Sequence, residues 1–270
     1  MTESESTKSR LPRTGTLVLI AAVLLIGGGA FMVWLPYHRE QQVIVEIERL
    51  GGSVKSNPNL NILNLPRVYH VDFSDTQVGD SALEDFHVFT NLGILSLNNT
   101  QVSDAGLEHL QGLSRLVYLH LDNTLIGSAG LEHIRGLTSI AFLSLDNSHV
   151  SDAGLEYVGE MPNLLTLSLN NTEVSGEGVE HLIGLKKLNQ IRFSNSNVSN
   201  SGLEYIGRLT NLEDLILNDT QVSDAGLEHL RGLTNLNFLF LENTRVTKVG
   251  LDKLQKALPD CKIVWTPPSP

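Results

Sequence analysis

Nine histidines are the residues of this 270-residue chain whose chemistry first suggests a metal site. Four of them, His109, His133, His181 and His229, recur at one position of a repeating pattern. Imidazole is a common metal ligand, but the ligands of a site must converge on one ion. Only His109 and His133 fall in adjacent repeats. We therefore expect surface histidines on separate turns and no metal site.

Catalytic patterns are also missing from the sequence. It contains no nucleotide-binding loop, no zinc-protease motif and no Ser-His-Asp arrangement. The single cysteine, Cys261, excludes internal disulfides and a cysteine-based zinc site, and we expect it to be buried in a closing strand. The sequence predicts a protein that is not an enzyme and has no cofactor.

The elements that position these residues come from a pattern that recurs every 24 residues. Residues 92–110 return almost unchanged as 212–230. One small hydroxyl residue recurs eight times without an insertion or deletion, at Thr76, Thr100, Thr124, Ser148, Thr172, Ser196, Thr220 and Thr244. A fixed period of this length predicts a solenoid in which each coil contacts only its neighbours.

Each repeat begins Leu-x-x-Leu-x-Leu, as in Leu116, Leu119 and Leu121. The last two leucines alternate like the inward residues of a strand, and stacked parallel strands bury them continuously. The hydroxyl that follows should lie inside the coil and bond to backbone groups. Residues 102–110 then predict a short helix with Ser103 or Asp104 as its N-cap.

Two series of glycines accompany this helix. Gly112, Gly136, Gly184 and Gly232 are predicted to end their helices at the C′ position. The second series begins at Gly106 and recurs in seven repeats, although glycine costs about 1 kcal/mol of helix propensity. We expect neighbouring helices to approach too closely there for a Cβ atom.

The strand residues that alternate with the inner leucines should point outward and form a concave face. They vary between repeats while the inner positions do not, which is how solenoids make binding surfaces. Two clusters combine aromatic and charged residues, as recognition patches do. The first is Tyr118, His120, Asp122, Phe142 and Asp146, and the second is Phe238, Phe240 and Glu242, with Asp214 and Asp219 nearby.

Asp122 and Asp146 occupy equivalent positions of adjacent repeats, so their strands should lie about 4.8 Å apart. Like charges this close are unfavourable unless solvent screens them or a cation joins them. Screening by water and docking of a basic, extended segment of a partner protein are both open. A calcium ion bound by these acids is a further alternative, although no calcium-loop motif supports it.

A second polar series precedes the hydroxyls, with Asn or Asp in every repeat. Its members are Asp75, Asn99, Asn123, Asn147, Asn171, Asn195, Asp219 and Asn243. Turn chemistry accounts for this series, because Asn and Asp bond to nearby backbone groups.

The repeat, with Val-Ser-Asp-Ala-Gly-Leu at 102–107 after its leucines, resembles the leucine-rich repeat family over residues 67–265. It is most similar to the cysteine-containing subclass, with Thr or Ser in place of that cysteine, and to repeats of bacterial membrane-anchored proteins. No F-box adaptor segment accompanies it. The resemblance implies an α/β solenoid, with a curved parallel sheet on the concave face, short helices on the convex face and a role in recognition.

The N-terminal region predicts a membrane anchor. Residues 17–35 are almost wholly apolar and about long enough to span a bilayer. Basic residues precede this run, which favours a cytoplasmic tail at 1–13, a single-pass signal-anchor helix at 14–36 and repeats outside the cytoplasm. A cleaved signal peptide is the alternative, but the apolar run is long and no Ala-x-Ala site follows it.

The remaining boundaries follow from the ends of the repeats. A juxtamembrane amphipathic helix at Arg39–Leu50, the stop at Gly51-Gly52 and a loop at Lys55–Pro66 should form an N-terminal cap within 37–66. Eight coils and a closing strand should fill 67–266, followed by a tail at 267–270.

The net charge of −11 argues against nucleic acid and anionic lipid as partners of the repeats. We expect a non-enzymatic, membrane-anchored ectodomain that binds a protein or peptide on its concave face. A self-assembling spacer of the bacterial envelope and a polysaccharide-binding module are the two alternatives.

Overall fold

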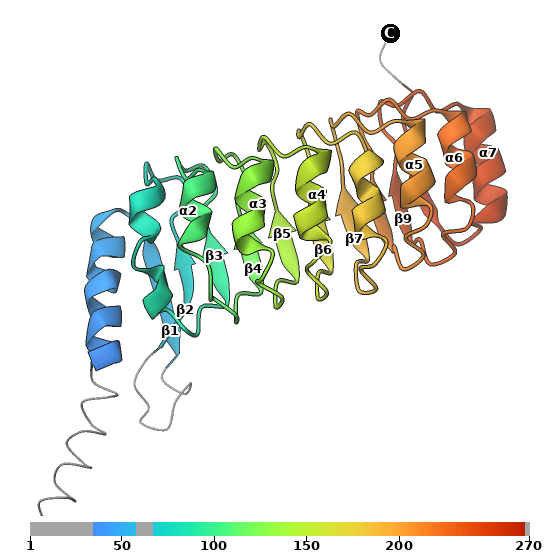
Figure 1. Cartoon of the computed structure of the whole chain (residues 1–270). Coiled ribbons are helices and arrows are strands. Elements are labelled where there is room, and N and C mark those ends of the chain that lie inside the picture. Colours follow the sequence, from blue (N-terminus) through green and yellow to red (C-terminus); the bar gives the residue numbers. More distant parts are fainter. Residues whose placement is uncertain (1–34, 58–66, 268–270) are drawn as a thin grey trace, which may run out of the picture.

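The computed structural model describes residues 35–57 and 67–267. They form an elongated stack of coils with strands along one side and helices along the other (Figure 1). The predicted signal-anchor at 14–36 falls outside the described residues except for its last two. Within the described ranges, no helix combines the length and the apolar character needed to cross a bilayer.

The strands form one ten-stranded sheet in sequence order. They are β1 (Ser53–Asn57), β2 (Arg67–Asp72), β3 (Ile94–Ser96), β4 (Tyr118–His120), β5 (Phe142–Ser144), β6 (Thr166–Ser168), β7 (Gln190–Arg192), β8 (Asp214–Ile216), β9 (Phe238–Phe240) and β10 (Lys262–Val264). From β2 to β10 every pairing is parallel and joins residues 24 apart. One 24-residue repeat of the sequence therefore separates the paired residues of neighbouring strands.

The other side of the stack carries short α- and 3-10 helices. They are η2 (Asp80–Leu83), η3 (Phe86–Val88), α2 (Asp104–Glu108), α3 (Ser128–Ile134), α4 (Asp152–Val158), η4 (Glu177–Leu182), α5 (Asn200–Ile206), α6 (Asp224–Leu230) and α7 (Lys248–Ala257). The leucines, valines and isoleucines between the two layers form one continuous buried core. The solenoid and its parallel sheet are as the sequence predicts.

The helix starts differ from the prediction that Ser103 or Asp104 caps its own helix. Ser103 holds the N-cap position of α2 without a side-chain capping bond. Its N–H and hydroxyl instead donate to the carboxylate of Asp80 in the preceding coil, both at 2.7 Å. Asp104 in turn accepts the N–H of Gly127 in the following coil at 2.7 Å. These acids join coils rather than cap helices, because the next coil's N–H lies within their reach.

The hydroxyl ladder lies inside the coils. Thr100 Oγ1 donates to the carbonyl oxygen of Leu97 at 2.7 Å, and Ser148 Oγ donates to that of Leu145 at 2.6 Å. The same bond to the residue three positions earlier recurs in all eight coils. Each hydroxyl thus satisfies a carbonyl at the point where the chain leaves the strand.

The helix glycines divide into two kinds. A Cβ atom on Gly178 would lie 2.6 Å from the carbonyl oxygen of Asp152 in the preceding coil, so this position requires glycine. In the other series only Gly112 has the positive φ, 86°, of a C′ glycine. The prediction of a C′ conformation was wrong for Gly136, Gly184 and Gly232, because none of them has a positive φ. A Cβ atom at any of these three positions would meet nothing within 4 Å.

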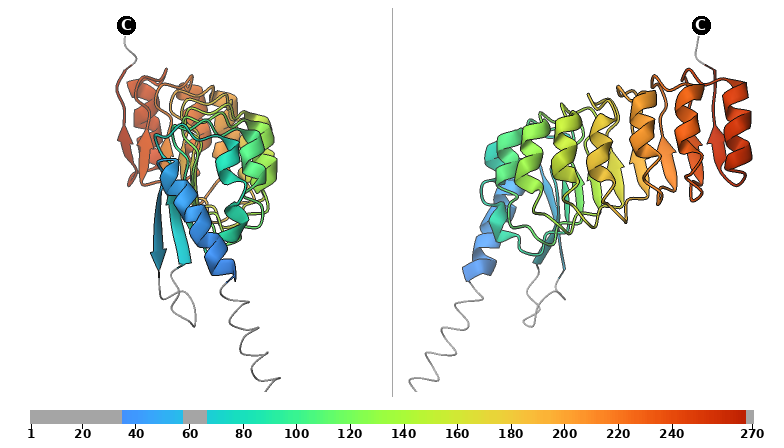
Figure 2. Two further views of the ribbon diagram at one scale, coloured as in Figure 1. Left: turned by 90° about the vertical axis from the view of Figure 1, so that its left-hand side faces the viewer. Right: turned by 45° about the vertical axis from the view of Figure 1, so that its right-hand side comes forward.

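The N-terminal helix, residues 35–49 of the described part, packs beside β1 and β2 at the end of the stack (Figure 2). Its Glu40 side chain is buried and accepts the N–H of Val68 and the guanidinium of Arg67, each at 2.7 Å. Ile47 is buried on the same helix. This helix therefore covers the open core of the first coil.

Two further sequence expectations concern the ends of the sheet. The loop expected at Lys55–Pro66 is instead strand at Lys55–Asn57, because β1 pairs antiparallel with β2, and residues 58–66 lie outside the described part. At the other end, β10 closes the sheet and Cys261 is buried beside it. Burial raises the pKa of the Cys261 thiol to about 11.

Candidate functional site

The concave face is the solvent-facing side of β2–β10, and it presents the two predicted clusters. In the first cluster the rings of Tyr118 and Phe142 stack with centroids 4.5 Å apart and planes inclined by 8°. Tyr118 is exposed, whereas Phe142 and His120 are half-buried. The strand register brings the two rings together, because β4 pairs Tyr118 with Phe142 of β5.

Asp122 and Asp146 are engaged in hydrogen bonds between coils. Asp122 Oδ1 accepts the N–H of Asp146 at 2.9 Å and the hydroxyl of Ser144 at 2.5 Å. Asp146 Oδ1 accepts the N–H of Asn170 at 2.9 Å and the hydroxyl of Ser168 at 2.6 Å. Donors within the protein therefore compensate these carboxylates, an explanation that the sequence reasoning did not consider.

The same bond continues along the solenoid. The side-chain oxygens of Asn98, Asn170 and Asn218 each accept a backbone N–H from the following coil, at 2.7–2.9 Å. The recurrence of Asn or Asp at this position was a visible signal for the ladder. Asp122 and Asp146 thus belong to a series of hydrogen bonds that joins neighbouring coils of the sheet.

The Asn/Asp series before the hydroxyls adopts the left-handed backbone conformation, with φ between 53° and 63° in all eight coils. Asn and Asp tolerate this conformation better than other non-glycine residues. Some of them also bond laterally, as Asn243 Nδ2 does to Asp219 Oδ1 at 2.6 Å. Turn geometry accounts for this series.

The second cluster lies in a shallow groove of about 560 Å³ on the concave face of β6–β9. Its lining residues are Asn170, Gln190, Arg192, Asp214, Ile216, Asn218, Phe238, Phe240 and Glu242. Phe238 is 41% exposed and its ring lies 6.4 Å from that of Phe240. The groove thus combines an apolar wall with charges of both signs, and the sequence reasoning did not place Arg192 in it.

The charged groups of this groove are incompletely compensated. Desolvation raises the pKa of Asp214, and the neighbouring Glu213 raises it further, whereas Arg192 acts in the opposite direction. Gln190 Nε2 donates to Asp214 Oδ2 at 3.2 Å. The Arg192 side chain is exposed and makes no hydrogen bond or ion pair with the other side chains that the structure describes. A ligand that supplies groups of both signs would complete this arrangement.

The histidines of the helical side lie apart from these clusters. His181 and His229 are exposed, and His109, the C-cap of α2, and His133 on α3 are half-buried. Among residues 35–57 and 67–267, no three His, Cys, Asp or Glu side chains gather closely enough to hold a metal ion.

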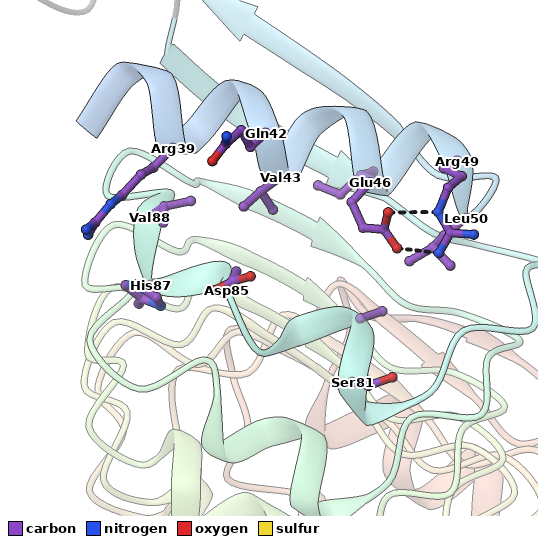
Figure 3. Close-up of a pocket in the computed structure, with 12 residues that line it drawn as sticks. Arg39, Gln42, Val43, Glu46, Arg49, Leu50, Ser81, Asp85, His87 and Val88 are labelled. Atoms are coloured by element: carbon purple, nitrogen blue, oxygen red, sulfur yellow. Dashed lines mark hydrogen bonds and ion pairs between the residues drawn. The ribbon is translucent and has the colours of Figure 1, made fainter. Parts of the chain in front are cut away.

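A second hollow, of about 440 Å³, separates the N-terminal helix from η2 and η3 (Figure 3). Val43 points into it from the helix, Val88 lies across from Val43 on η3, and Leu50 lines its other end just after the helix. Arg39 and the ion pair of Glu46 with Arg49 border it (Figure 3). The sequence indicated the helix but not this hollow.

No family model matches the sequence, and no curated protein matches it. Solved structures do match its fold. Internalin C2 of Listeria monocytogenes is 21% identical with a TM-score of 0.61, over 78% of this chain and 89% of that one.

Two other solved structures show the same arrangement of repeats. The HAESA receptor kinase ectodomain of Arabidopsis, in complex with a peptide hormone, is 20% identical with a TM-score of 0.56. That match covers 74% of this chain but 34% of HAESA. A leucine-rich repeat protein of Leptospira interrogans is 16% identical with a TM-score of 0.50, over 71% of this chain and 59% of that one. With its 24-residue strand register, this chain has the fold of a leucine-rich repeat solenoid.

Proposed function

We propose that this chain is a membrane-anchored, non-enzymatic recognition protein whose concave face binds a protein or peptide. The groove over β6–β9 carries the proposal, since it joins exposed Phe238 to the incompletely compensated charges of Arg192 and Asp214. Aromatic and arginine side chains supply much of the binding energy at protein interfaces. The fold is also that of HAESA, whose ectodomain was solved with a peptide hormone.

The geometry of the aromatic residues favours a peptide over a polysaccharide. Sugars stack on open ring faces, but Tyr118 and Phe142 cover one face of each other. Lys262 Nζ lies 5.8 Å from the ring centroid of Phe238 and covers part of that ring. Protein groups therefore already occupy part of the ring surface on which a sugar would stack, whereas the apolar side chains of a peptide can also pack against ring edges.

The binding test uses the full-length chain in nanodiscs as bait for proteins of its native envelope. We expect Phe238→Ala combined with Arg192→Ala to lose the captured partner. The matched control is Tyr118→Ala combined with His120→Ala, which changes an aromatic and a basic residue in the other cluster. Loss only in this control would move the site to β4, and retention in both variants would refute concave-face binding.

The anchor has its own test. The apolar run at 17–35 should keep the intact chain in the membrane pellet after a carbonate wash. Recovery of a soluble form that begins near residues 31–37 would instead show that a signal peptide is cleaved.

A further inference from the structure

Charge is distributed unevenly between the two edges of the solenoid. The strand-start edge consists of the loops that lead from each helix into the next strand, namely residues 111–117 and the equivalents in each coil. Its basic residues are Arg115, Arg135, Lys186, Lys187, Arg208, Arg231 and Lys256, all exposed, and its acids are Glu160, Glu213 and Asp260. This edge is therefore basic in a chain whose net charge is −11.

The opposite edge has the reverse composition. It consists of residues 99–104 and their equivalents, where each coil turns from strand to helix. Its acids are Asp75, Asp80, Asp104, Asp152, Glu173, Asp219 and Asp224, and its basic residues are Arg245 and Lys248. The two edges thus differ in the sign of their charge, and most of the net charge of −11 comes from residues on neither edge.

The basic side chains keep most of their charge available. Arg115 and Lys187 donate to neutral amide oxygens of Asn91 and Asn163, at 2.8 and 2.6 Å, which orients them without neutralising them. The Arg135–Glu160 ion pair is long, at 4.0 Å, and half-exposed, so it contributes little.

Four other residues of this edge complete the set, and the first of them, Lys186, donates from Nζ to the neutral carbonyl oxygen of Ile183 at 3.3 Å. Arg231 pairs with Glu228 at 2.9 Å, and both side chains are about half-exposed. Arg208 and Lys256 have no ion pair or hydrogen bond among the described side chains. The edge therefore presents a row of cations along the solenoid.

The described part of the N-terminal helix, residues 35–49, starts at this same edge. Glu40, near its start, bonds to Arg67 and Val68 at the beginning of β2, whereas Gly52, just after its end, abuts Phe73 beyond the end of β2. The helix thus runs alongside β2 from the strand-start edge towards the opposite one (Figures 1 and 2). The apolar run at 17–35 leads directly into it.

We propose that the strand-start edge lies on the anionic lipid headgroups of the membrane that holds the anchor. This inference rests on the anchor of the proposed function, because that anchor brings the bilayer to this edge rather than to the acidic one. Basic residues are attracted to anionic headgroups within a screening length of about 8 Å at physiological ionic strength. The concave face would then open sideways, parallel to the bilayer, and remain accessible to a partner.

The test attaches a fluorophore to a Thr234→Cys variant, labelled on the strand-start edge, in full-length protein reconstituted in nanodiscs. A second sample carries it at Gln221, on the opposite edge; both positions are exposed. Native Cys261 is buried with a thiol pKa of about 11, so it stays unlabelled. Quenching by headgroup-attached quenchers is compared between neutral phosphatidylcholine and mixtures containing phosphatidylglycerol.

We expect stronger quenching at position 234 in anionic discs than in neutral ones, and no such difference at position 221. The difference should disappear at about 1 M salt, where the screening length is about 3 Å. Arg208→Gln with Lys256→Gln should weaken it, whereas Arg245→Gln with Lys248→Gln, which removes the same charge from the opposite edge, should not.

Equal quenching in both lipids would overturn the proposal, as would equal effects of the two double variants. A single-stranded oligonucleotide that binds this edge while the anionic bilayer does not would also overturn it. Retention in the pellet after a carbonate wash, measured on cell membranes that contain the same chain, reports the anchor alone. A failed anchor and a failed edge contact are therefore distinguishable.

Discussion

Individual polar residues of the repeat bond mainly to backbone groups of their own or a neighbouring coil. Thr172 donates to Leu169 within its coil, and Asp122 accepts the N–H of Asp146 from the next coil. Because unpaired buried polar groups are costly, these bonds allow a thin solenoid to contain many polar side chains.

Thr172→Leu should destabilise the fold by roughly 1–3 kcal/mol, because the larger side chain overpacks a buried position. It also leaves the carbonyl of Leu169 without its donor. Thr172→Ser should cost much less, since Ser148 and Ser196 make the equivalent bond. Urea melts measure both changes, and equally small effects would place the ladder on the surface.

Cys261 gives a pH-dependent prediction. Burial raises its thiol pKa from 9.0 to about 11, so the folded state holds this proton more tightly than the unfolded state. The resulting contribution to stability should be constant below about pH 9 and decline between about pH 9 and pH 11. Urea melts of the wild type and Cys261→Ala across this range compare the two slopes, and identical slopes would contradict the assignment.

Single residues also show how far the sequence could predict the site. The roles of the hydroxyl series and the Asn/Asp series could be predicted from the sequence, because these side chains act within their own turn of the chain. The bonds of Asp80 to Ser103 and of Asp122 to Asp146 were missed. The 24-residue period shows which residues are equivalent in successive coils, but it does not give the distance between a side chain and the backbone of the next coil. Arg192 was overlooked in the groove because the clusters were drawn around aromatic residues of other strands.

At the scale of elements, the close packing of neighbouring helices sets the requirement for glycine. Gly178 lies against the carbonyl of Asp152, while Gly184, six residues later, faces open space. Both were evident as repeats in the sequence, yet only the coil geometry separates a required glycine from a tolerant one.

Gly178→Ala should cost roughly 1–3 kcal/mol, because the added Cβ forces the adjoining coils apart. Gly184→Ala should change stability by no more than about 0.5 kcal/mol, as expected of an exposed site without close contacts. Thermal melts of this matched pair measure the contrast. Similar losses in both variants would mean that helix propensity, rather than coil spacing, governs these positions.

One buried ion pair, between Glu40 and Arg67, joins the N-terminal helix to β2. Glu40→Gln should cost about 3 kcal/mol or more, because it leaves Arg67 without its carboxylate partner. Glu46→Gln, at the exposed pair with Arg49, is the control and should have little effect. Hydrogen exchange of residues 35–49 should accelerate only in the first variant, and unchanged exchange would show that apolar packing alone holds the helix.

At the scale of the whole molecule, one repeat produces three different surfaces. The concave face carries the groove over β6–β9, the strand-start edge is basic, and the opposite edge is acidic. The overall charge of −11 argued against contact with anionic lipid, but that total conceals the separation of charge between edges. The separation becomes visible only when the residues are assigned to sides of the coil.

Site-specific photo-crosslinking in the native envelope tests recognition by the concave face most directly. A photoreactive phenylalanine analogue replaces Phe240 in the groove in one sample and Ala225 on α6, the helical side, in another. We expect a discrete crosslinked protein or peptide from position 240 that is absent from position 225. Crosslinks only from position 225, equal crosslinks from both, or none from position 240 would contradict the account.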